Sequence, residues 1–371
     1  MSSKINPKIE TFARIKMIGI GNSGTNSVNY MVQTKLKGVE FVSIDTDAQK
    51  LHHSKAEKKI HIGKNLTRGL GGGMNPEIGK QAAEETKEAI QETIKGADMI
   101  FITCGFGGAT GTGAAPVVAK IAKEQGILSI AVVTRPFSFE GAQRARIAEN
   151  GLANLKEMVD AMIVIPNDRI LNVIKKDTSL LGAFGMCDEV LKNAVQGISD
   201  LITIPGIINV DFADVKSIMK GAGSALMGVG TAEGEKRAEQ AAQTAINSPL
   251  LDLSIDGATG VLFAISGGEN MTMSEIQEAA NIITDSIDNE ARVIFGAIHD
   301  NLLKKNEIKV TVIASGFPEE KNERKSQIFT PSIPKDEKIE TDESQGKTKE
   351  SDDEDEDQWD SVPAFLRRKR A

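Results

Sequence analysis

The sequence predicts an α/β protein built on a doubly wound parallel sheet. Short apolar and β-branched runs alternate with segments of helical periodicity along most of the chain, which is typical of βαβ units. Glycine-rich turns follow several of these runs, as expected where the strands of a parallel sheet lead into helices. The length of 371 residues exceeds what one hydrophobic core usually holds, so we expect more than one domain.

The first half of the chain supplies the strands of this sheet. We predict strands at 14–20, 39–44, 98–103, 128–133 and 161–165. The clearest helix between them runs from Asn75 to Lys95, because Asn75 can cap it, Pro76 suits its first position and Gly96 can end it. Helices that alternate with the strands should cover both faces of the sheet.

A long helix and a second domain follow. Apolar residues recur at spacings of three and four from Leu180 to Leu201, which predicts one apolar stripe along a helix of about 33 Å. Beyond this helix we predict further helices near 213–220, 234–247 and 274–286, with strands near 260–266, 291–297 and 307–315. This second region is therefore expected to be an α+β domain.

Composition excludes several classes of protein. The net charge of −8 and the 4% of aromatic residues, with Trp359 and Tyr30 the only examples of their kinds, argue against a nucleic-acid partner. Cys104 and Cys187 cannot form a disulfide framework. No apolar run is long enough to cross a bilayer or to act as a signal peptide, so we expect a cytoplasmic protein.

Two glycine-rich loops point to phosphate binding. Gly19–Gly24 matches the pattern GxGxxG, and Asp45 follows at the end of the next predicted strand, as in dinucleotide-binding folds. An NAD(P)-dependent oxidoreductase is therefore one possibility. The loop Gly105–Gly113 is a second candidate cradle for phosphate, which hydride transfer does not explain. Neither loop carries the lysine of a P-loop NTPase.

An ordered series of motifs then resembles a known family. The motifs are TDAQ at 46–49, GLGGGMNPEIG at 69–79, GGATGTGAAP at 107–116, PFSFEG at 136–141, IPND at 165–168, NVDFADV at 209–215, SPLL at 248–251 and the terminal VPAFLRRKR. Together they resemble the FtsZ family, the tubulin-like GTPases of bacterial cell division. The resemblance implies a tubulin-like fold, GTP or GDP with Mg²⁺ as cofactors, and head-to-tail filaments in the cytoplasm at the division site.

The resemblance also implies a division of the chain into six parts. These are a flexible head at 1–12, a GTP-binding Rossmann-like domain at 13–179, a connecting helix at 180–204, a C-terminal α+β domain at 205–317, a disordered acidic linker at 318–358 and a partner-binding peptide at 359–371. The linker assignment also follows from composition, since it holds few large apolar residues. The segment from Trp359 to Arg370 is expected to dock on membrane tethers and regulatory division proteins, so that contact with the membrane is only indirect.

The nucleotide site that the resemblance implies involves several loops. The phosphates would lie on Gly21, Asn22, Ser23, Gly24, Thr25, Asn26, Gly107, Gly108, Ala109, Thr110 and Gly111, near Asp45 and Asp47. The terminal phosphate would be sensed by Gly71, Gly72 and Gly73. The ribose end would meet Pro136, Glu140 and Arg144, and the guanine would meet Asn167 and Asp188 with Phe184 packed on the base.

Some of these positions depart from the family pattern. Asn22, Ser23 and Ala109 stand where many members carry glycine, and each side chain narrows the backbone conformations available. Asp45 stands where asparagine is common, and it could cap a turn, accept a bond from Mg²⁺-bound water, or repel the phosphates. A filament protein with impaired hydrolysis is therefore a third possibility.

The candidate catalytic residues lie after the long helix. Asp211 and Asp214 are three positions apart at a predicted helix start, a spacing that suits a capping arrangement. The resemblance implies that they, with Asn209, complete the nucleotide site of the next subunit, and both roles are compatible. A loop at the far end of a helix of this length cannot reach the nucleotide of its own chain.

Overall fold

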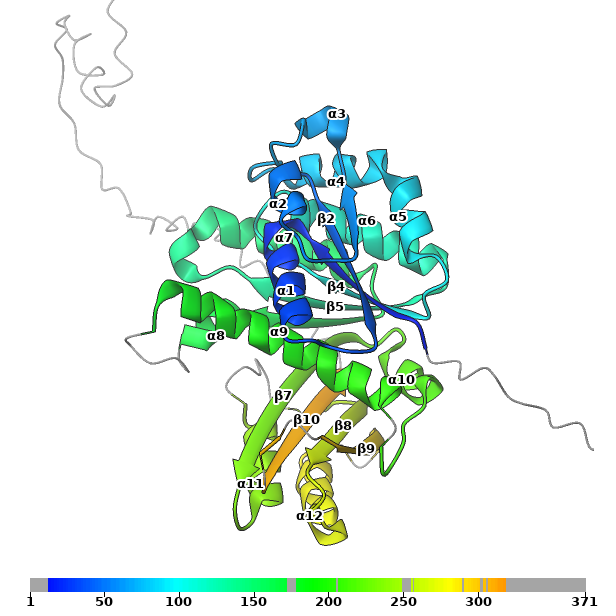
Figure 1. The fold of residues 1–371 in the computed structure, drawn as a ribbon, viewed down its shortest axis with the longest axis vertical. Coiled ribbons are helices and arrows are strands. Elements are labelled where there is room, and N and C mark those ends of the chain that lie inside the picture. The colour runs from blue at the N-terminus through cyan, green and yellow to red at the C-terminus, as the bar shows by residue number, and fades with distance from the viewer. Residues whose placement is uncertain are drawn as a thin grey trace, which may run out of the picture. The chain divides into compact units, whose positions relative to one another are not determined.

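The structure is a computed structural model that describes residues 13–171, 178–204, 206–248, 255, 257–288, 290–300, 303–304 and 306–317. The described strands form one ten-stranded sheet in the order β3-β2-β1-β4-β5-β6-β7-β10-β8-β9 (Figure 1). The predictions for the head, the linker and the terminal peptide lie outside the described residues. No helix in the described ranges is long and apolar enough to cross a bilayer.

Six parallel strands form the first part of this sheet. They are β1 (Ile15–Ile20), β2 (Val39–Asp45), β3 (Lys58–His61), β4 (Met99–Thr103), β5 (Leu128–Arg135) and β6 (Ala161–Pro166). Every residue of β1 and β4 is buried, as expected of strands covered on both faces. The predicted doubly wound parallel sheet is thereby confirmed. The prediction missed β3, a short edge strand that begins with two exposed lysines.

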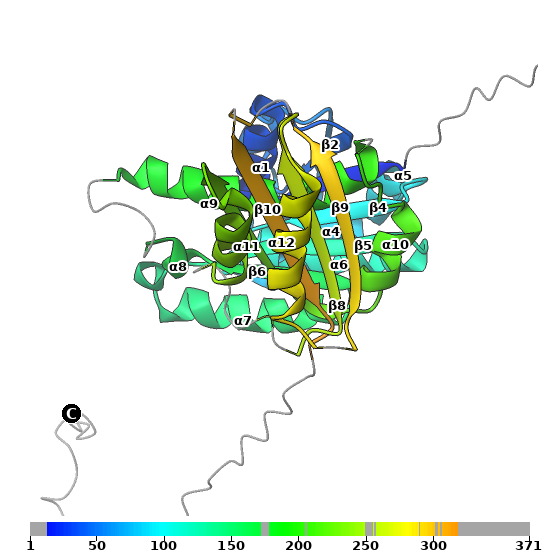
Figure 2. The ribbon, with the colours of Figure 1, turned by 90° about the horizontal axis from the view of Figure 1, so that it is seen from below.

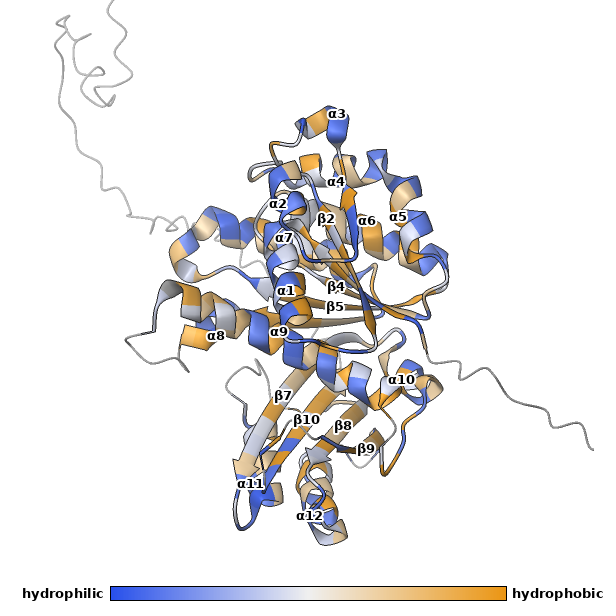
Figure 3. Ribbon diagram, viewed as in Figure 1, coloured by the Kyte–Doolittle hydropathy of each residue, from blue (hydrophilic) through white to orange (hydrophobic). Residues whose placement is uncertain are grey.

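Helices cover both faces of these strands. They are α1 (Gly21–Gln33), α2 (Ala48–His52), α3 (Lys64–Thr67), α4 (Pro76–Glu85), α5 (Lys87–Ile94), α6 (Thr110–Glu124), the 3₁₀ turn η1 (Ser138–Glu140), α7 (Ala142–Lys156) and α8 (Asn167–Leu171). One core joins α1 and the later helix α9 (Leu180–Thr203) to one face of the sheet, and a second core joins the four helices from α4 through α7 to the other face. Figure 3 shows hydrophobic residues gathered on β4 and β5 and alternating with hydrophilic ones along the helices.

The single helix predicted from Asn75 to Lys95 is wrong, because the structure holds two helices. The chain breaks at Thr86, whose φ of −111° and ψ of 20° lie outside the helical region. The Thr86 hydroxyl donates a hydrogen bond to the carbonyl of Ala82 at 3.1 Å. The predicted start is correct, since the Asn75 side chain accepts from the Glu77 amide at 3.1 Å and Pro76 is the first helical residue.

The helix α9 (Leu180–Thr203) has 24 residues, which at 1.5 Å per residue makes it about 36 Å long. The predicted stripe is confirmed at Cys187, Leu191, Ala194, Ile198 and Leu201, all of which are buried in the core shared with α1 and the sheet. α9 runs between the two parts of the sheet, with α8 at one end and α10 (Phe212–Met219) at the other (Figure 1).

The second part contains α10 (Phe212–Met219), β7 (Gly223–Glu233), α11 (Arg237–Ile246), β8 (Gly260–Gly267), α12 (Met273–Thr284), β9 (Arg292–His299) and β10 (Glu307–Ser315). β10 pairs antiparallel with β7 and β8, so the sheet is mixed here. Helices α11 and α12 cover one face of it (Figure 2). The prediction missed β7, because Gly228 and Gly230 lack the side chains of a typical strand and instead admit α11 at close range.

Candidate functional site

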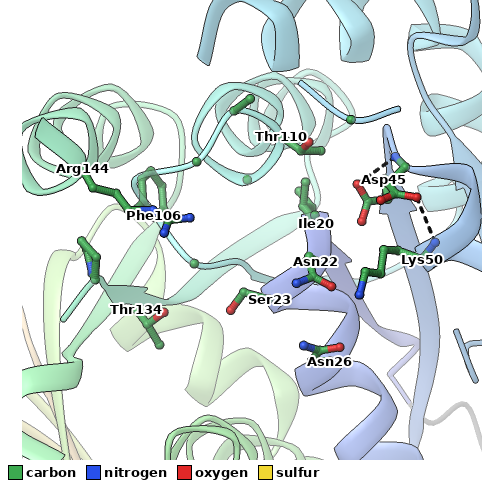
Figure 4. Close-up of a pocket in the computed structure, with 18 of the residues that line it drawn as sticks. Ile20, Asn22, Ser23, Asn26, Asp45, Lys50, Phe106, Thr110, Thr134 and Arg144 are labelled. Carbon is green, nitrogen blue, oxygen red and sulfur yellow. Dashed lines mark hydrogen bonds between the residues drawn. The ribbon is translucent and has the colours of Figure 1, made fainter. Parts of the chain in front are cut away.

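A pocket of about 550 Å³ lies at the carboxyl ends of the parallel strands, facing the first turns of α1 and α6 and the start of α9 (Figure 4). Ligands of open α/β sheets bind at this edge. The structure brings most of the predicted binding residues together in its lining: Gly21, Asn22, Ser23, Asn26, Asp45, Asp47, Gly71, Gly73, Gly108, Ala109, Thr110, Gly111, Pro136, Glu140, Arg144, Asn167, Phe184 and Asp188.

Two helix N-termini face this pocket. α1 begins at Gly21 directly after β1, and the φ of +72° at Gly21 is one that glycine adopts without strain. α6 begins at Thr110, after the glycine-rich loop that follows β4. Neither helix carries an acidic residue in its first turn, so free N–H groups and the positive ends of two helix dipoles are available to an anion.

Four of the predicted binding residues do not line the pocket. Gly24 packs against the backbone of Gly19 and Thr103, where a side chain would not fit. Gly107 donates its N–H to the hydroxyl of Thr112 at 2.9 Å. The other two are Thr25, which is buried, and Gly72, which faces Ala109. The tight packing of these residues shapes the loops beneath the pocket.

The loop at Gly71–Gly73 is joined to the glycine-rich loop before α6. The Ala109 N–H donates to the carbonyl of Gly73 at 3.1 Å, and the methyl group of Ala109 is buried next to Gly72. The alanine at this position therefore packs in the contact between the two loops.

Asp45 is a buried carboxylate in the wall of the pocket. Its side chain accepts from the amides of Thr46 at 2.7 Å and Asp47 at 3.2 Å, both through Oδ1. Its Oδ2 is buried and has no hydrogen-bond partner among the described residues. Burial raises the pKa of Asp45 to about 6, although the two amides partly oppose the shift. Asp45 thus brings to the wall of the pocket a buried carboxylate with one oxygen that has no partner in the described chain.

Asp47 has a structural role in the same wall. Its carboxylate caps α2 by accepting from the amides of Gln49 at 2.9 Å and Lys50 at 3.1 Å. This bonding holds the first turn of α2 at the mouth of the pocket, where Lys50 also belongs to the lining.

The opposite end of the pocket is suited to a flat, polar ring. Asp188 on α9 accepts a hydrogen bond from the Ser27 hydroxyl at 2.6 Å, and burial raises the pKa of this carboxyl. Asn167 is buried, and its Oδ1 has no partner among the described residues. Phe184, although part of the predicted apolar stripe, is 43% exposed, and its ring meets the buried ring of Phe137 edge to face at 5.5 Å.

Glu140 and Arg144 form an ion pair on the rim. Arg144 Nη1 lies 2.7 Å from Glu140 Oε2, and Glu140 Oε1 accepts from the Phe137 amide at 3.0 Å. The pair is therefore fixed to the loop that carries the aromatic ring behind Phe184.

Comparison with known proteins identifies this arrangement. The Tubulin/FtsZ family GTPase domain matches residues 14–175, and the FtsZ family C-terminal domain matches residues 223–318. The solved FtsZ dimer of M. jannaschii, determined without a ligand, shares 47% sequence identity with a TM-score of 0.79, covering 82% of this chain and 89% of that one. The chain belongs to the Tubulin/FtsZ family.

Further structures agree with this assignment. A mutant M. jannaschii FtsZ also shares 47% identity and a TM-score of 0.79, covering 83% of this chain and 92% of its own. The GDP-bound CetZ1 monomer of Haloferax volcanii, at 21% identity and a TM-score of 0.71, covers 82% of this chain and 95% of its own and supports the fold alone. Since the family is one of GTPases, the GxGxxG loop belongs to a GTP-binding domain, and the oxidoreductase alternative is not supported.

In this family member the candidate catalytic residues lie away from the pocket. Asn209, Asp211 and Asp214 are exposed, are not in its lining, and follow the far end of α9 (Figure 1). Asp211 accepts from the Asp214 amide at 2.9 Å, and Asp214 accepts from the Asp211 amide at 3.3 Å, so the predicted capping arrangement is present. Asn209 accepts from the Gly206 amide at 2.7 Å and closes the loop before α10.

Part of the lining was not predicted residue by residue. Ile20, Gly105 and Phe106 lie in the two loops predicted to hold phosphate and Thr46 lies in the TDAQ motif, whereas Lys50, Thr134, Cys187 and Leu191 were not predicted to line the site. Most of the residues that were not predicted lie next to predicted ones in the sequence, and this closeness is the signal that could have indicated them. Lys50 also adjoins the TDAQ motif, and its charge beside a predicted phosphate site could have singled it out. Among the described residues no group of three His, Cys, Asp or Glu side chains could hold a metal ion alone.

Proposed function

We propose that the protein binds GTP in this pocket, assembles head to tail into filaments of the cell-division ring, and hydrolyses GTP at the contact between subunits. The observation that carries the proposal is the position of Asp211 and Asp214. Both acids are exposed beyond the end of α9 and outside the lining of the pocket, and the part of α9 that follows Leu191, the last lining residue, is about 18 Å long. Acids placed there act on a nucleotide only if the next subunit brings one to them.

Guanine recognition would rest on Asp188 and Asn167. A carboxylate accepts hydrogen bonds from the N1–H and the exocyclic amine of guanine, a pair of donors that adenine does not present together. The Asn167 side chain, whose Oδ1 lacks a partner among the described residues, offers a further polar contact. The half-exposed ring of Phe184 provides a surface for the base.

The phosphates would lie over the N-termini of α1 and α6. Mg²⁺ fits this arrangement, because it is commonly held by one or two carboxylates together with the phosphates of the substrate, and Asp45 Oδ2 is a buried oxygen without a partner in the described chain. Mg²⁺ bound there would neutralise negative charge that develops on the phosphates. Asp45 would hold it, directly or through water.

The two acids of the neighbouring subunit would orient the attacking water. Their capping bonds use Oδ1 of Asp211 and Oδ2 of Asp214, and the described residues make no hydrogen bond to the second oxygen of either carboxylate. The capping box therefore fixes the two side chains while leaving one oxygen of each to accept a proton or a hydrogen bond from water. Phosphoryl transfer needs mainly such positioning and charge stabilisation.

Assembly follows from the same geometry. A contact between the pocket end of one subunit and the Asp211 end of the next is heterologous and repeats without closing, so it generates a filament. The names of two related structures, an FtsZ dimer from M. jannaschii and a CetZ2 protofilament from Haloferax volcanii, are consistent with assembly in the family. We further propose a cytoplasmic location at the division site, with Trp359 to Arg370 as the docking segment for membrane tethers and regulatory proteins.

The proposal is tested by measuring phosphate release per subunit over a dilution series, together with pelleting in GTP or GDP. We expect the rate per subunit to rise with protein concentration and polymer to form with GTP. A rate that does not change on dilution would contradict the proposal. Polymer without phosphate release would instead favour the filament protein with impaired hydrolysis.

Variants of Asp211 separate its two roles. Asparagine caps a helix about as well as aspartate, so Asp211→Asn should keep stability within about 0.5 kcal/mol, whereas Asp211→Ala should lose about 1 kcal/mol. Both should form polymer with GTP and turn it over very slowly, as should Asp214→Ala. Turnover by Asp211→Asn at the wild-type rate would assign the residue to capping alone.

A further inference from the structure

The charges that line the pocket are poorly matched to a nucleotide. The described lining holds four acids, Asp45, Asp47, Glu140 and Asp188, but only two bases, Lys50 and Arg144. A nucleoside diphosphate or triphosphate adds several negative charges to this set. Backbone N–H groups and helix dipoles supply partial positive charge, yet a full positive charge near the phosphates would stabilise binding further.

One of the two bases already forms an ion pair. Arg144 Nη1 lies 2.7 Å from Glu140 Oε2, and Glu140 is in turn held by the Phe137 amide. The ammonium group of Lys50, in contrast, makes no hydrogen bond or ion pair with any residue that the structure describes. Lys50 is therefore the base in the described lining whose charge is not neutralised by a neighbour.

Lys50 is held at the pocket by its backbone. Its N–H donates to the capping carboxylate of Asp47 at 3.1 Å, which fixes the first turn of α2. Figure 4 shows the side chain on the same side of the pocket as Asp45, across from Arg144, with its end directed toward Asn22 and Asn26. These two asparagines belong to the first turns of α1, over which the phosphates are proposed to lie.

Asp45 gives the second observation. Its Oδ2 is buried without a partner in the described chain, and the residue is only 2% exposed. An unpaired carboxylate in this wall repels phosphate. A positively charged side chain on the same side of the pocket offsets that repulsion. A lysine can do so because its ammonium group is a compact charge on a flexible chain.

We propose that Lys50 is a phosphate-binding residue of this chain and that its charge offsets that of Asp45. The inference rests on the proposed function, since it names a further residue of the nucleotide site. The positive charge of Lys50 also explains how a site for an anionic ligand can contain Asp45 as a second acid close to Asp47.

The test compares Lys50→Gln with the wild type in the absence of divalent metal, using GDP, GTP and guanosine as ligands and the dissociation constant as the readout. We expect Lys50→Gln to weaken GDP and GTP binding roughly three- to tenfold, as for loss of one exposed charge-assisted contact, and to leave guanosine binding unchanged. Lys55→Gln, an exposed lysine outside the lining, is the matched control and should bind all three as the wild type does.

A double variant tests the balance of charge. Asp45→Asn alone should tighten GDP binding, and Asp45→Asn combined with Lys50→Gln should return the affinity toward that of the wild type. If the double variant does not return to the wild-type affinity, the proposal that Lys50 offsets the charge of Asp45 is overturned. If Lys50→Gln binds GDP and GTP as the wild type does, or loses as much affinity for guanosine, the proposal that Lys50 binds phosphate is overturned. If the wild type binds no guanine nucleotide, the proposed function itself fails, an outcome distinct from normal binding by Lys50→Gln.

Discussion

The Ser27 hydroxyl donates a hydrogen bond of 2.6 Å to the carboxylate of Asp188 and thereby joins α1 to α9. The two residues are 161 positions apart in the chain. Burial raises the pKa of Asp188, whereas the bond from Ser27 lowers it by stabilising the charged form. Ser27 thus orients the carboxylate proposed to read the guanine and opposes the rise in its pKa.

Removal of this hydroxyl should weaken guanine nucleotide binding. In Ser27→Ala we expect the affinity for GDP to fall roughly three- to tenfold, because the carboxylate of Asp188 loses the bond that orients it toward the ligand. The affinity should also fall as the pH is lowered through the pKa of Asp188, because a protonated carboxyl cannot accept from both guanine donors. In Ser27→Ala this fall should move to higher pH. Calorimetric titration with GDP from pH 5 to 8 measures both effects, and Ser224→Ala, an exposed serine far from the pocket, serves as the control.

Asp45 should make the stability of the ligand-free protein depend on pH. Its pKa is raised from 3.8 to about 6, so the folded state holds a proton that the unfolded state releases. The stabilising contribution is therefore complete below about pH 4 and is lost as the pH rises through 6. Asp45→Asn removes the charged form and should be more stable than the wild type at pH 7.5 by about 3 kcal/mol, but not at pH 4. Chemical denaturation at the two pH values measures this, and an equal difference at both would refute it.

How far the sequence predicted the fold depended on whether local signals agreed with tertiary packing. The stripe on α9 and the cap at Asn75 were predictable because periodicity and capping chemistry act locally. The break at Thr86 was not, since the residues around it form helix well and the threonine bond to Ala82 replaces the regular ladder. β7 was not predicted, because its glycines are required by the close approach of α11, and the local sequence does not show that contact.

The candidate site shows the same limit. The motifs predicted which loops meet, because loops after parallel strands share one edge of the sheet. They did not predict the bond between Ser27 and Asp188, or that Asp45 Oδ2 has no partner in the described part of the chain, since both depend on how side chains from separate elements face one another. Lys50 lay next to a predicted motif, but that its ammonium group has no partner among the described residues is visible only once those residues are placed.

A buried ion pair should control the stability of the second part of the sheet. Arg237 contacts Glu275 through two bonds of 2.6 and 3.0 Å, and the Arg237 side chain is only 6% exposed. The pair joins α11 to α12 and also lowers the pKa of Glu275. Because that pKa is lowered from 4.5, the contribution is present above about pH 4.5 and is lost as the pH falls through the folded value.

Arg237→Met removes two hydrogen bonds between charged groups, whereas Glu275, 22% exposed, keeps its bonds from the amide and hydroxyl of Thr272. We therefore expect Arg237→Met to lower the free energy of unfolding by about 2 kcal/mol at pH 7 and to do so much less at low pH. The exposed pair of Lys304 and Glu233 is the comparison, since water screens such pairs and Lys304→Met should change the stability much less than Arg237→Met does. Thermal unfolding of both variants at the two pH values tests the difference, and equal losses would argue against a special role for burial.

Two glycine substitutions should have opposite effects on stability. A side chain on Gly113 of α6 would collide with the backbone of Pro76 and Lys80 in α4, so Gly113→Ala must push two packed helices apart. We expect a loss of about 2 to 3 kcal/mol, in the range for overpacked cores. Gly185 lies within α9, and a methyl group there would meet nothing within 4 Å, so Gly185→Ala should gain up to about 1 kcal/mol from helix propensity. Urea denaturation of both variants measures the two changes in stability. If both variants lost stability, the tight fit at Gly113 would not explain the loss there.

The close contact of α4 with α6 also determines where the loop before α6 meets Gly71–Gly73, so Gly113→Ala should lower nucleotide affinity as well as stability.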